Sequence, residues 1–266
     1  MYLIIFAICL NVFLSINALS ASPMPPMQVV VVSIDALHPN ALTKENSPHL
    51  VDIMQRGHYT LRGTSTQPPK TLIAHSAMIT GHEQRQNNDW KPGEPTIAGS
   101  TIFDWAKSKG MATAFYYSKP KLGYLQSRAV DSAALSPDDA QGHAERFLAK
   151  NAHAFAFVHI SGLDWQGPVT GWLSPGYNEV LRFIDKELKT LIDSLAARKN
   201  FLLIVTSDHA GHGKIHGSDH PEDDKLPLIA WSDTCNTSHV TDKIFHVTML
   251  ASTIESLLRQ CVLPPK

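Results

Sequence analysis

The chain alternates short apolar runs, rich in β-branched residues, with longer amphipathic segments. The runs at 29–34 (VVVVSI), 112–117 (ATAFYY), 154–160 (AFAFVHI) and 201–207 (FLLIVTS) have the length and composition of buried strands. Amphipathic segments follow three of these runs, and the longest of them is YNEVLRFIDKELKTLIDSLAARK at 177–199. The pattern predicts an α/β fold with a mostly parallel central sheet and helices on both of its faces.

A different apolar run, YLIIFAICLNVFLSI, opens the chain and is followed by small residues up to Ala21. This pattern predicts a signal peptide over residues 1–21 and an exported protein, periplasmic or secreted. The run is short for a bilayer span, so we expect no stable membrane anchor. No Lys or Arg precedes it, and an uncleaved anchor or a buried first strand is the alternative. Residues 22–266 then have a length suited to a single domain.

The composition excludes one class of partner and favours one kind of site. A formal net charge of −1 provides no broad basic surface, so no nucleic-acid polymer is expected as a partner. Only Cys235 and Cys261 lie outside the predicted leader; they could pair in an oxidising compartment, but the sequence does not show that they are close. The 14 histidines are concentrated in DHAGHGKIHGSDH at 208–220, a density that favours metal binding.

Three predicted strands run into an acid, namely Asp35, Asp164 and Asp208, and His209 follows the last of these. Ligands bind at the carboxyl ends of the strands in open α/β sheets, so these carboxylates should converge on one crevice. One such aspartate could simply cap a helix. Three of them beside a histidine cluster indicate a divalent metal with mixed nitrogen and oxygen ligands, zinc above all, with manganese as another candidate.

At these positions the sequence resembles the alkaline phosphatase superfamily, specifically its type I phosphodiesterase/nucleotide pyrophosphatase-like branch. The opening motif VVVVSID implies that Asp35 is a metal ligand. PPKTLIAHSAMITG implies Thr71 as the nucleophile and a metal ligand, although the usual proline of this motif is Ile73. SDHAGHGKIHG has Ala210 at a position where the family has glycine. This motif implies that Asp208 and His209 bind one metal and that His216 binds the other.

The fourth motif departs from the family at a metal ligand. DWQGPVTGWLSPGY matches the family pattern at Asp164 and Tyr177 among others, but Pro168 stands where a histidine is expected. Proline offers no side-chain lone pair, so the second metal would keep only Asp164 and His216 as protein ligands. The possible substitutes are His212, His220, Gln166, water or phosphate. Trp172, in place of a family proline, is a milder departure.

The resemblance implies a three-layer α/β/α catalytic domain with two divalent ions, most plausibly zinc, that hydrolyses small-molecule phosphomonoesters or phosphodiesters. The Thr71 hydroxyl would attack phosphorus and form a covalent phospho-threonine, which water then hydrolyses. A sulfatase would need Cys or Ser at this position. The rival hypothesis is a phosphate- or nucleotide-binding pseudoenzyme, whose metal site is impaired by Pro168. Oligomeric state is left open.

Four further residues are candidates for supporting roles. Asn88, in RQNNDWKP, resembles the family asparagine that donates to a phosphoryl oxygen, although paired asparagines are ordinarily turn residues. Lys119 and Lys121 could neutralise phosphate charge, yet charged loop residues are usually solvated. His75, four residues after Thr71, would orient the nucleophile. We expect the loops at 84–99 and 161–176 to line the site.

Overall fold

Eight strands form one mixed sheet in the computed structural model, which describes residues 26–261. The predicted leader at 1–21 lies outside the described residues. The strand order across the sheet is β4-β3-β5-β1-β6-β7-β2-β8. The strands are β1 (Gln28–Ile34), β2 (His58–Thr64), β3 (Ala112–Tyr117), β4 (Ser132–Leu135), β5 (Ala154–Ile160), β6 (Phe201–Thr206), β7 (Lys225–Ser232) and β8 (Phe245–His246).

The half of the sheet from β4 to β6 is entirely parallel, with β1 between β5 and β6 at its centre. The first strand is fully buried, as are its two neighbours except at one end of β5, which is why their sequences are continuous apolar runs. On the other side β7 is antiparallel to both β6 and β2, and β2 pairs with β8 in parallel. The predicted mostly parallel α/β sheet is therefore confirmed, with one reversed strand.

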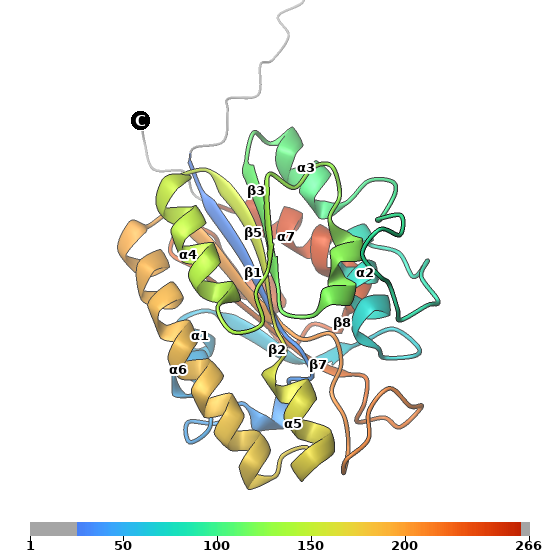
Figure 1. Ribbon diagram of the computed structural model, residues 1–266. Coiled ribbons are helices and arrows are strands. Elements are labelled where there is room, and N and C mark those ends of the chain that lie inside the picture. The colour runs from blue at the N-terminus through green and yellow to red at the C-terminus, as the bar shows by residue number, and fades with distance from the viewer. Residues whose placement is uncertain (1–25, 262–266) are drawn as a thin grey trace, which may run out of the picture.

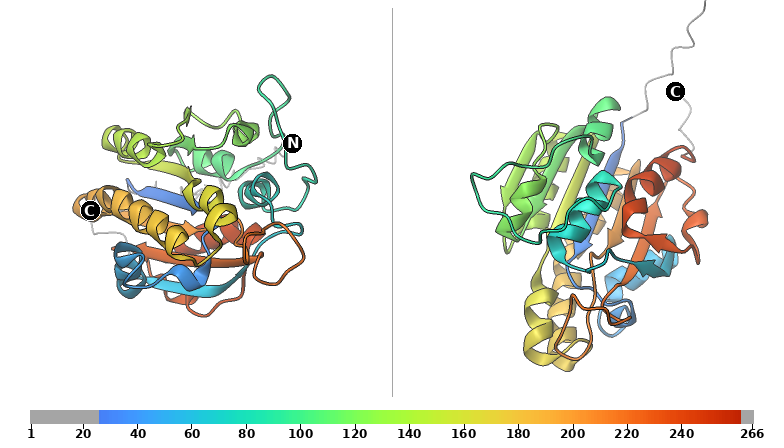
Figure 2. Two further views of the ribbon diagram at one scale, coloured as in Figure 1. Left: turned by 60° about the horizontal axis from the view of Figure 1, so that its bottom comes forward. Right: turned by 90° about the vertical axis from the view of Figure 1, so that its right-hand side faces the viewer.

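Helices cover both faces of this sheet, so the molecule has three layers (Figure 1; Figure 2). Side chains alternate between the two faces along β1: Val29 and Val31 join the core under α2, α3 and α7, while Val30 and Val32 join the core under α1, α4 and α6. The helices are α1 (Pro48–Arg56), α2 (Thr71–Thr80), α3 (Ile102–Ser108), α4 (Ala140–Lys150), α5 (Gly162–Thr170), α6 (Pro175–Arg198) and α7 (Leu250–Leu258).

The segment 161–176, predicted as a long loop, is for the most part α5, and that prediction was wrong. Pro168 lies inside this helix and cannot donate the backbone hydrogen bond that a continuous helix expects there. Packing against α6 stabilises the helix instead: Gly162 is so close to Val180 and Ile184 that an added Cβ would lie 3.1 Å and 3.2 Å from their side chains. The segment 84–99 is irregular, as predicted.

Two further features of the chain concern its cysteines and its helices. Cys235 and Cys261, whose pairing the sequence left open, form a disulfide. Among residues 26–261, no helix is long and apolar enough to cross a membrane.

Asp185 joins α6 to the start of α1. Its carboxylate is 1 % exposed and accepts hydrogen bonds from the backbone amides of His49 at 3.0 Å and Leu50 at 2.8 Å. These amides belong to the first turn of α1, where no partner exists within the helix, so Asp185 supplies the acceptor from another element. The contact fixes α1 against α6, which cover the same face of the sheet.

Asp185→Ala should lower the free energy of unfolding by about 1–3 kcal/mol, because the backbone amides of His49 and Leu50 lose their charged acceptor. Asp193→Ala is the matched control on the same helix, where an exposed carboxylate pairs with Lys189, and its cost should be below about 1 kcal/mol. Urea denaturation followed by circular dichroism measures both. Equal losses in the two variants would contradict the capping role of Asp185.

Candidate active site

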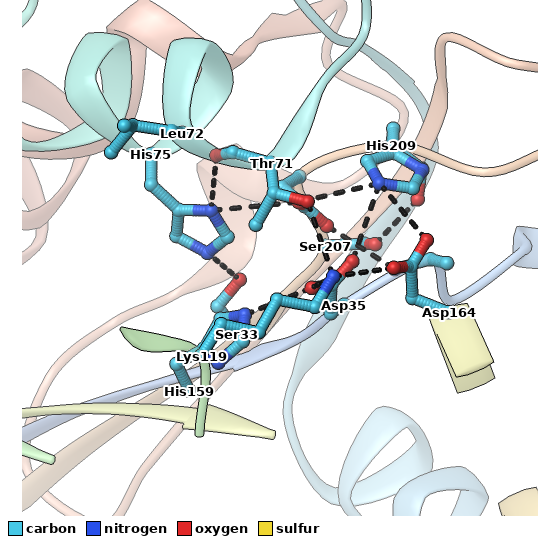
Figure 3. A network of polar contacts seen from close by, with 12 residues as sticks. Ser33, Asp35, Thr71, Leu72, His75, Lys119, His159, Asp164, Ser207 and His209 are labelled. Carbon is cyan, nitrogen blue, oxygen red and sulfur yellow. Dashed lines mark hydrogen bonds and ion pairs between the residues drawn. The ribbon is translucent and has the colours of Figure 1, made fainter. Parts of the chain in front are cut away.

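Three aspartates meet at the carboxyl edge of the sheet. Asp35 follows β1, Asp208 lies two residues beyond β6, and Asp164 is in the first turn of α5, shortly after β5. Because β5, β1 and β6 are adjacent parallel strands, their ends deliver these side chains to one place. Figure 3 shows Asp35, Asp164 and His209 converging there, with Thr71 and Lys119.

The turn after Asp35 is held in an uncommon conformation. Ala36 has a φ of 64°, and its backbone amide donates to Asp208 Oδ1 at 3.2 Å. The hydroxyl of Tyr177 donates to the Ala36 carbonyl at 2.7 Å and accepts from the His38 amide at 3.0 Å. Tyr177 is fully buried, so its role is to fix this turn and not to line a substrate pocket.

Thr71 is the first residue of α2, so its side chain lies at a helix N-terminus, which favours negative charge. His75 Nδ1 lies 2.7 Å from the Thr71 carbonyl, which can only accept, so the proton is on Nδ1 and Nε2 accepts from Ser33 Oγ at 2.8 Å. Asn88 Oδ1 accepts from the Leu72 amide at 2.8 Å, which leaves the amide nitrogen of Asn88 as a donor near Thr71. His75 and Asn88 thus both contact the first turn of α2.

Lys119, placed by the sequence among solvated loop residues, is 5 % exposed. It follows β3, and its ammonium lies 2.6 Å from Asp35 Oδ2 and 3.3 Å from Thr71 Oγ1. It also forms an ion pair and hydrogen bond with Asp164 Oδ2. One lysine therefore links two of the three aspartates to the candidate nucleophile. Lys121 is only partly buried.

Four buried polar atoms at this place have no hydrogen-bond partner within the described part of the chain: Asp35 Oδ1, Asp164 Oδ1, Asp208 Oδ2 and His209 Nε2. His209 Nε2 lies 3.3 Å from the Asp35 atom and 3.6 Å from each of the other two. The Nδ1 of His209 is 2.9 Å from the Ala210 carbonyl and carries a proton, so Nε2 is the ring atom that would bind a metal ion. Three carboxylate oxygens around an imidazole nitrogen suit a divalent cation.

The remaining predicted ligand, His216, lies beside Asp164. Its Nε2 is 3.3 Å from Asp164 Oδ1, and its ring stacks on that of His209 with centroids 4.9 Å apart. Trp172 packs against His216 at 5.4 Å, so the tryptophan at the proline position supports this imidazole. Two ligand groups follow, Asp35 with Asp208 and His209, and Asp164 with His209 and His216.

The suggested substitutes for the missing histidine lie elsewhere. His212 Nδ1 is 2.7 Å from Asp223 Oδ1, and the His212 ring stacks on His220 at 3.7 Å, so these three residues form a cluster of their own. Gln166 instead bonds to Thr170 on α5. Among residues 26–261, none of these three side chains forms a hydrogen bond or ion pair with Asp164 or His216.

One supporting residue was missed by the sequence reasoning. His159, at the penultimate position of β5, is buried, and its Nε2 lies 3.0 Å from Asp35 Oδ2. The Ser118 backbone amide donates to His159 Nδ1 at 3.4 Å, so Nε2 carries the proton that is donated to Asp35. A histidine inside the apolar run AFAFVHI was the available signal, since a buried polar group needs a partner.

Burial and the charges of the cluster shift the pKa values of several groups in it. Burial raises the pKa of Asp208 to about 7, and the charge of Asp35 adds to this effect. Burial alone would lower the pKa of His209, yet Asp208 and Asp35 raise it to about 9. Burial likewise opposes the charge of Lys119, but Asp35 and Asp164 outweigh it and raise its pKa. Without a metal ion, His209 and Lys119 thus serve as the counter-ions of these carboxylates.

Comparison of the sequence with known protein families identifies one family over most of the chain. The sequence profile described as "Type I phosphodiesterase / nucleotide pyrophosphatase" matches residues 29–88 and 82–224, which is most of the chain. Among curated proteins, GPI ethanolamine phosphate transferase 1 of Saccharomyces cerevisiae is 32% identical over 85 residues. That match covers 30% of this chain and 9% of the transferase, so the chain spans a small part of this relative.

Solved structures share the fold at low sequence identity. Murine ectonucleotide pyrophosphatase/phosphodiesterase 5 in complex with AMP has a TM-score of 0.69 and 16% identity, over 90% of this chain and 97% of that one. The C-terminal periplasmic domain of EptC from Escherichia coli, in complex with zinc, has a TM-score of 0.64 and 14% identity, over 88% and 82% of the two chains. These likenesses establish the alkaline phosphatase-like α/β/α fold.

Asp208→Asn should reduce the zinc bound per chain, because it replaces an anionic ligand of the buried group with a neutral amide. His220→Ala, which removes an exposed ligand from the separate His212–His220–Asp223 cluster, is the control and should leave zinc content unchanged. Elemental analysis of purified protein after dialysis measures both. Zinc loss in His220→Ala with none in Asp208→Asn would move the metal to the other cluster.

Proposed function

Because this chain belongs to the type I phosphodiesterase/nucleotide pyrophosphatase family, we propose that it is a metal-dependent enzyme that cleaves small phosphoesters, with Thr71 as the nucleophile. The observation that carries this proposal is the convergence of four partnerless buried ligand atoms beside the Thr71 hydroxyl. The proposed catalytic unit is the predicted domain at 22–266, and the proposed setting is outside the cytoplasm, as the leader suggests.

We propose that the buried ligand group holds a divalent ion, preferably zinc. The ion would be bound by Asp35, Asp208 and His209, with Thr71 beside them. The zinc complex of the EptC domain is consistent with this choice. When bound, such an ion would lower the pKa of the Thr71 hydroxyl and stabilise negative charge on the phosphoryl oxygens. The predicted second position, on Asp164 and His216, has two protein ligands of its own.

The chain's own groups prepare Thr71 for attack on phosphorus. Its oxygen lies at the start of α2, where helix N–H groups favour an anion, and 3.3 Å from the Lys119 ammonium. His75 holds the carbonyl of the same residue. Asn88, anchored by the Leu72 amide, is proposed to donate its amide hydrogen to a phosphoryl oxygen, in the way that preorganised donors stabilise transition-state charge.

The reaction follows from these positions in two displacements. The bond from Thr71 Oγ to phosphorus forms as the bond to the leaving oxygen breaks, and the hydroxyl proton of Thr71 passes through solvent to the leaving alkoxide. Water then cleaves the phospho-threonine and restores the hydroxyl. A diester would release a phosphomonoester, and a monoester would release phosphate. An alcohol in place of water would give transfer, the activity in the name of the yeast relative.

One observation favours a second candidate function, a phosphate- or nucleotide-binding pseudoenzyme. Pro168 occupies the expected histidine position and lies within α5, where it offers the site no ligand. A protein of this kind would bind phosphate esters at the start of α2 without turnover. Turnover of an aryl phosphate or an aryl phosphodiester that depends on added metal separates the two functions.

Thr71→Ala should reduce hydrolysis by at least about 1000-fold without a change in thermal stability, because it removes only the nucleophile. Thr80→Ala, at the other end of α2, should keep nearly full activity. Steady-state rates on both aryl substrates measure the loss, and mass spectrometry of acid-quenched wild-type enzyme should find a phosphorylated Thr71. Turnover of Thr71→Ala at the wild-type rate would remove Thr71 from the mechanism.

A further inference from the structure

A short turn after β7 presents an asparagine to solvent. Residues 236–238 read Asn-Thr-Ser, which matches the pattern Asn-X-Ser/Thr of N-glycosylation acceptors, and no other triplet of the chain matches it. Burial alternates along this turn: Cys235 and Thr237 are buried, whereas Asn236 and Ser238 are exposed. The two side chains that define the pattern are therefore both at the surface.

Hydrogen bonds fix the turn and leave the two reactive groups of the pattern free. Thr237 Oγ1 lies 2.8 Å from His58 Nδ1 on β2, and Asn236 Oδ1 accepts from the Ser238 amide at 2.9 Å. Among residues 26–261, neither Asn236 Nδ2 nor the Ser238 hydroxyl forms a hydrogen bond. A turn of this kind needs only the side-chain oxygen of Asn236 and the backbone amide of Ser238. The free amide nitrogen and the hydroxyl are not needed for the turn.

The residue before the turn connects it to an oxidising environment. Cys235 forms the disulfide with Cys261, and disulfides form and persist in secretory and extracellular compartments. Acceptor asparagines of this pattern are modified on the surface loops of secreted proteins. The disulfide and the exposed pattern, adjacent in the chain, thus point to the same compartment as the predicted leader.

We propose that Asn236 is a site of N-linked glycosylation. The donor is a lipid-linked oligosaccharide pyrophosphate, and the Asn236 amide nitrogen forms a bond to C1 of its first sugar. The bond from C1 to the pyrophosphate oxygen breaks, the lipid pyrophosphate leaves with the electron pair of that bond, and the amide nitrogen releases one proton. The modification goes beyond the proposed function and does not depend on it.

A glycan at Asn236 would lie at the sheet edge opposite to the candidate active site. Strand β7 is antiparallel to β6, with Ser232 opposite Leu202, so the segment after β7 lies at the amino end of β6. Asp208 lies beyond the carboxyl end of the same strand, about 20 Å from Leu202 at roughly 3.3 Å per residue. The glycan would therefore leave access to the three carboxylates open.

The first test counts the glycans on each chain. The full chain is produced in cultured animal cells, and its intact mass is measured before and after digestion with peptide N-glycosidase. The proposal expects one glycan on the wild type, and peptide mapping after digestion should find aspartate at position 236. A wild-type chain without a glycan, whether secreted or retained by the cells, would overturn the proposal.

The second test removes each half of the pattern. Asn236→Gln deletes the acceptor, and Ser238→Ala deletes only the hydroxyl, so the second variant keeps the turn and the disulfide. Both should carry no glycan, whereas Ser238→Thr, which restores the pattern, should carry one. A glycan on Asn236→Gln or on Ser238→Ala would contradict the assignment, as would its absence from Ser238→Thr.

Asn87 provides the matched control. It is exposed, and its Oδ1 accepts from the Asp89 amide at 2.9 Å, the same arrangement as at Asn236 but without a hydroxyl two residues later. Asn87→Gln should therefore carry the same single glycan as the wild type. Loss of the glycan in this variant would place the modification at Asn87 and overturn the proposal.

The third test concerns the position of the glycan on the folded protein. Peptide N-glycosidase should release it completely without denaturant, because Asn236 is exposed. Release that requires unfolding would contradict the surface position on which the proposal depends. None of these measurements uses phosphoester hydrolysis, so a glycosylated chain without hydrolase activity would refute the proposed function alone.

Discussion

The active-site edge of this protein depends on how three buried carboxylates are neutralised. Parallel strands β5, β1 and β6 end side by side, and their connections place Asp164, Asp35 and Asp208 within a few ångströms of one another. Such a group is unstable without cations, because burial and mutual repulsion both oppose ionisation. Lys119 meets part of this demand, and the partnerless oxygens and imidazole nitrogen define where the rest is met.

Polar groups around the charge cluster form hydrogen bonds that hold its residues in place. The hydroxyl of Tyr177 bridges both backbone sides of the turn after Asp35, and His159 holds the second oxygen of the same carboxylate. Ser65 donates to the Asp208 carbonyl, and Ser207 donates to the His209 carbonyl at 2.7 Å. The segments that carry Asp35, Asp208 and His209 are thereby fixed by buried hydrogen bonds, which is the preorganisation that electrostatic catalysis requires.

Features with local chemical causes could be predicted from the sequence. The buried parallel strands follow from their apolar runs, and the extent of α2 follows from the change at Thr71 from a proline-rich stretch to a helical one. The burial of Lys119 could not be predicted, because it depends on Asp35 and Asp164, which are distant in the chain. The partner of His159 is similarly distant. The glycines and Pro168 favoured a loop at 161–176, where packing on α6 selects a helix instead. Strand β2 has a weak apolar pattern, and the apolar run of β7 contains Pro227, which is unusual within a sheet.

The central claim is that the three carboxylates and His209 hold a divalent metal ion beside the Thr71 hydroxyl. The most direct measurement is an anomalous difference map, recorded at the zinc edge, from crystals grown with excess zinc. The account predicts a peak bounded by Asp35, Asp208 and His209. A peak at the separate His212–His220–Asp223 cluster, with none at the three carboxylates, would contradict it.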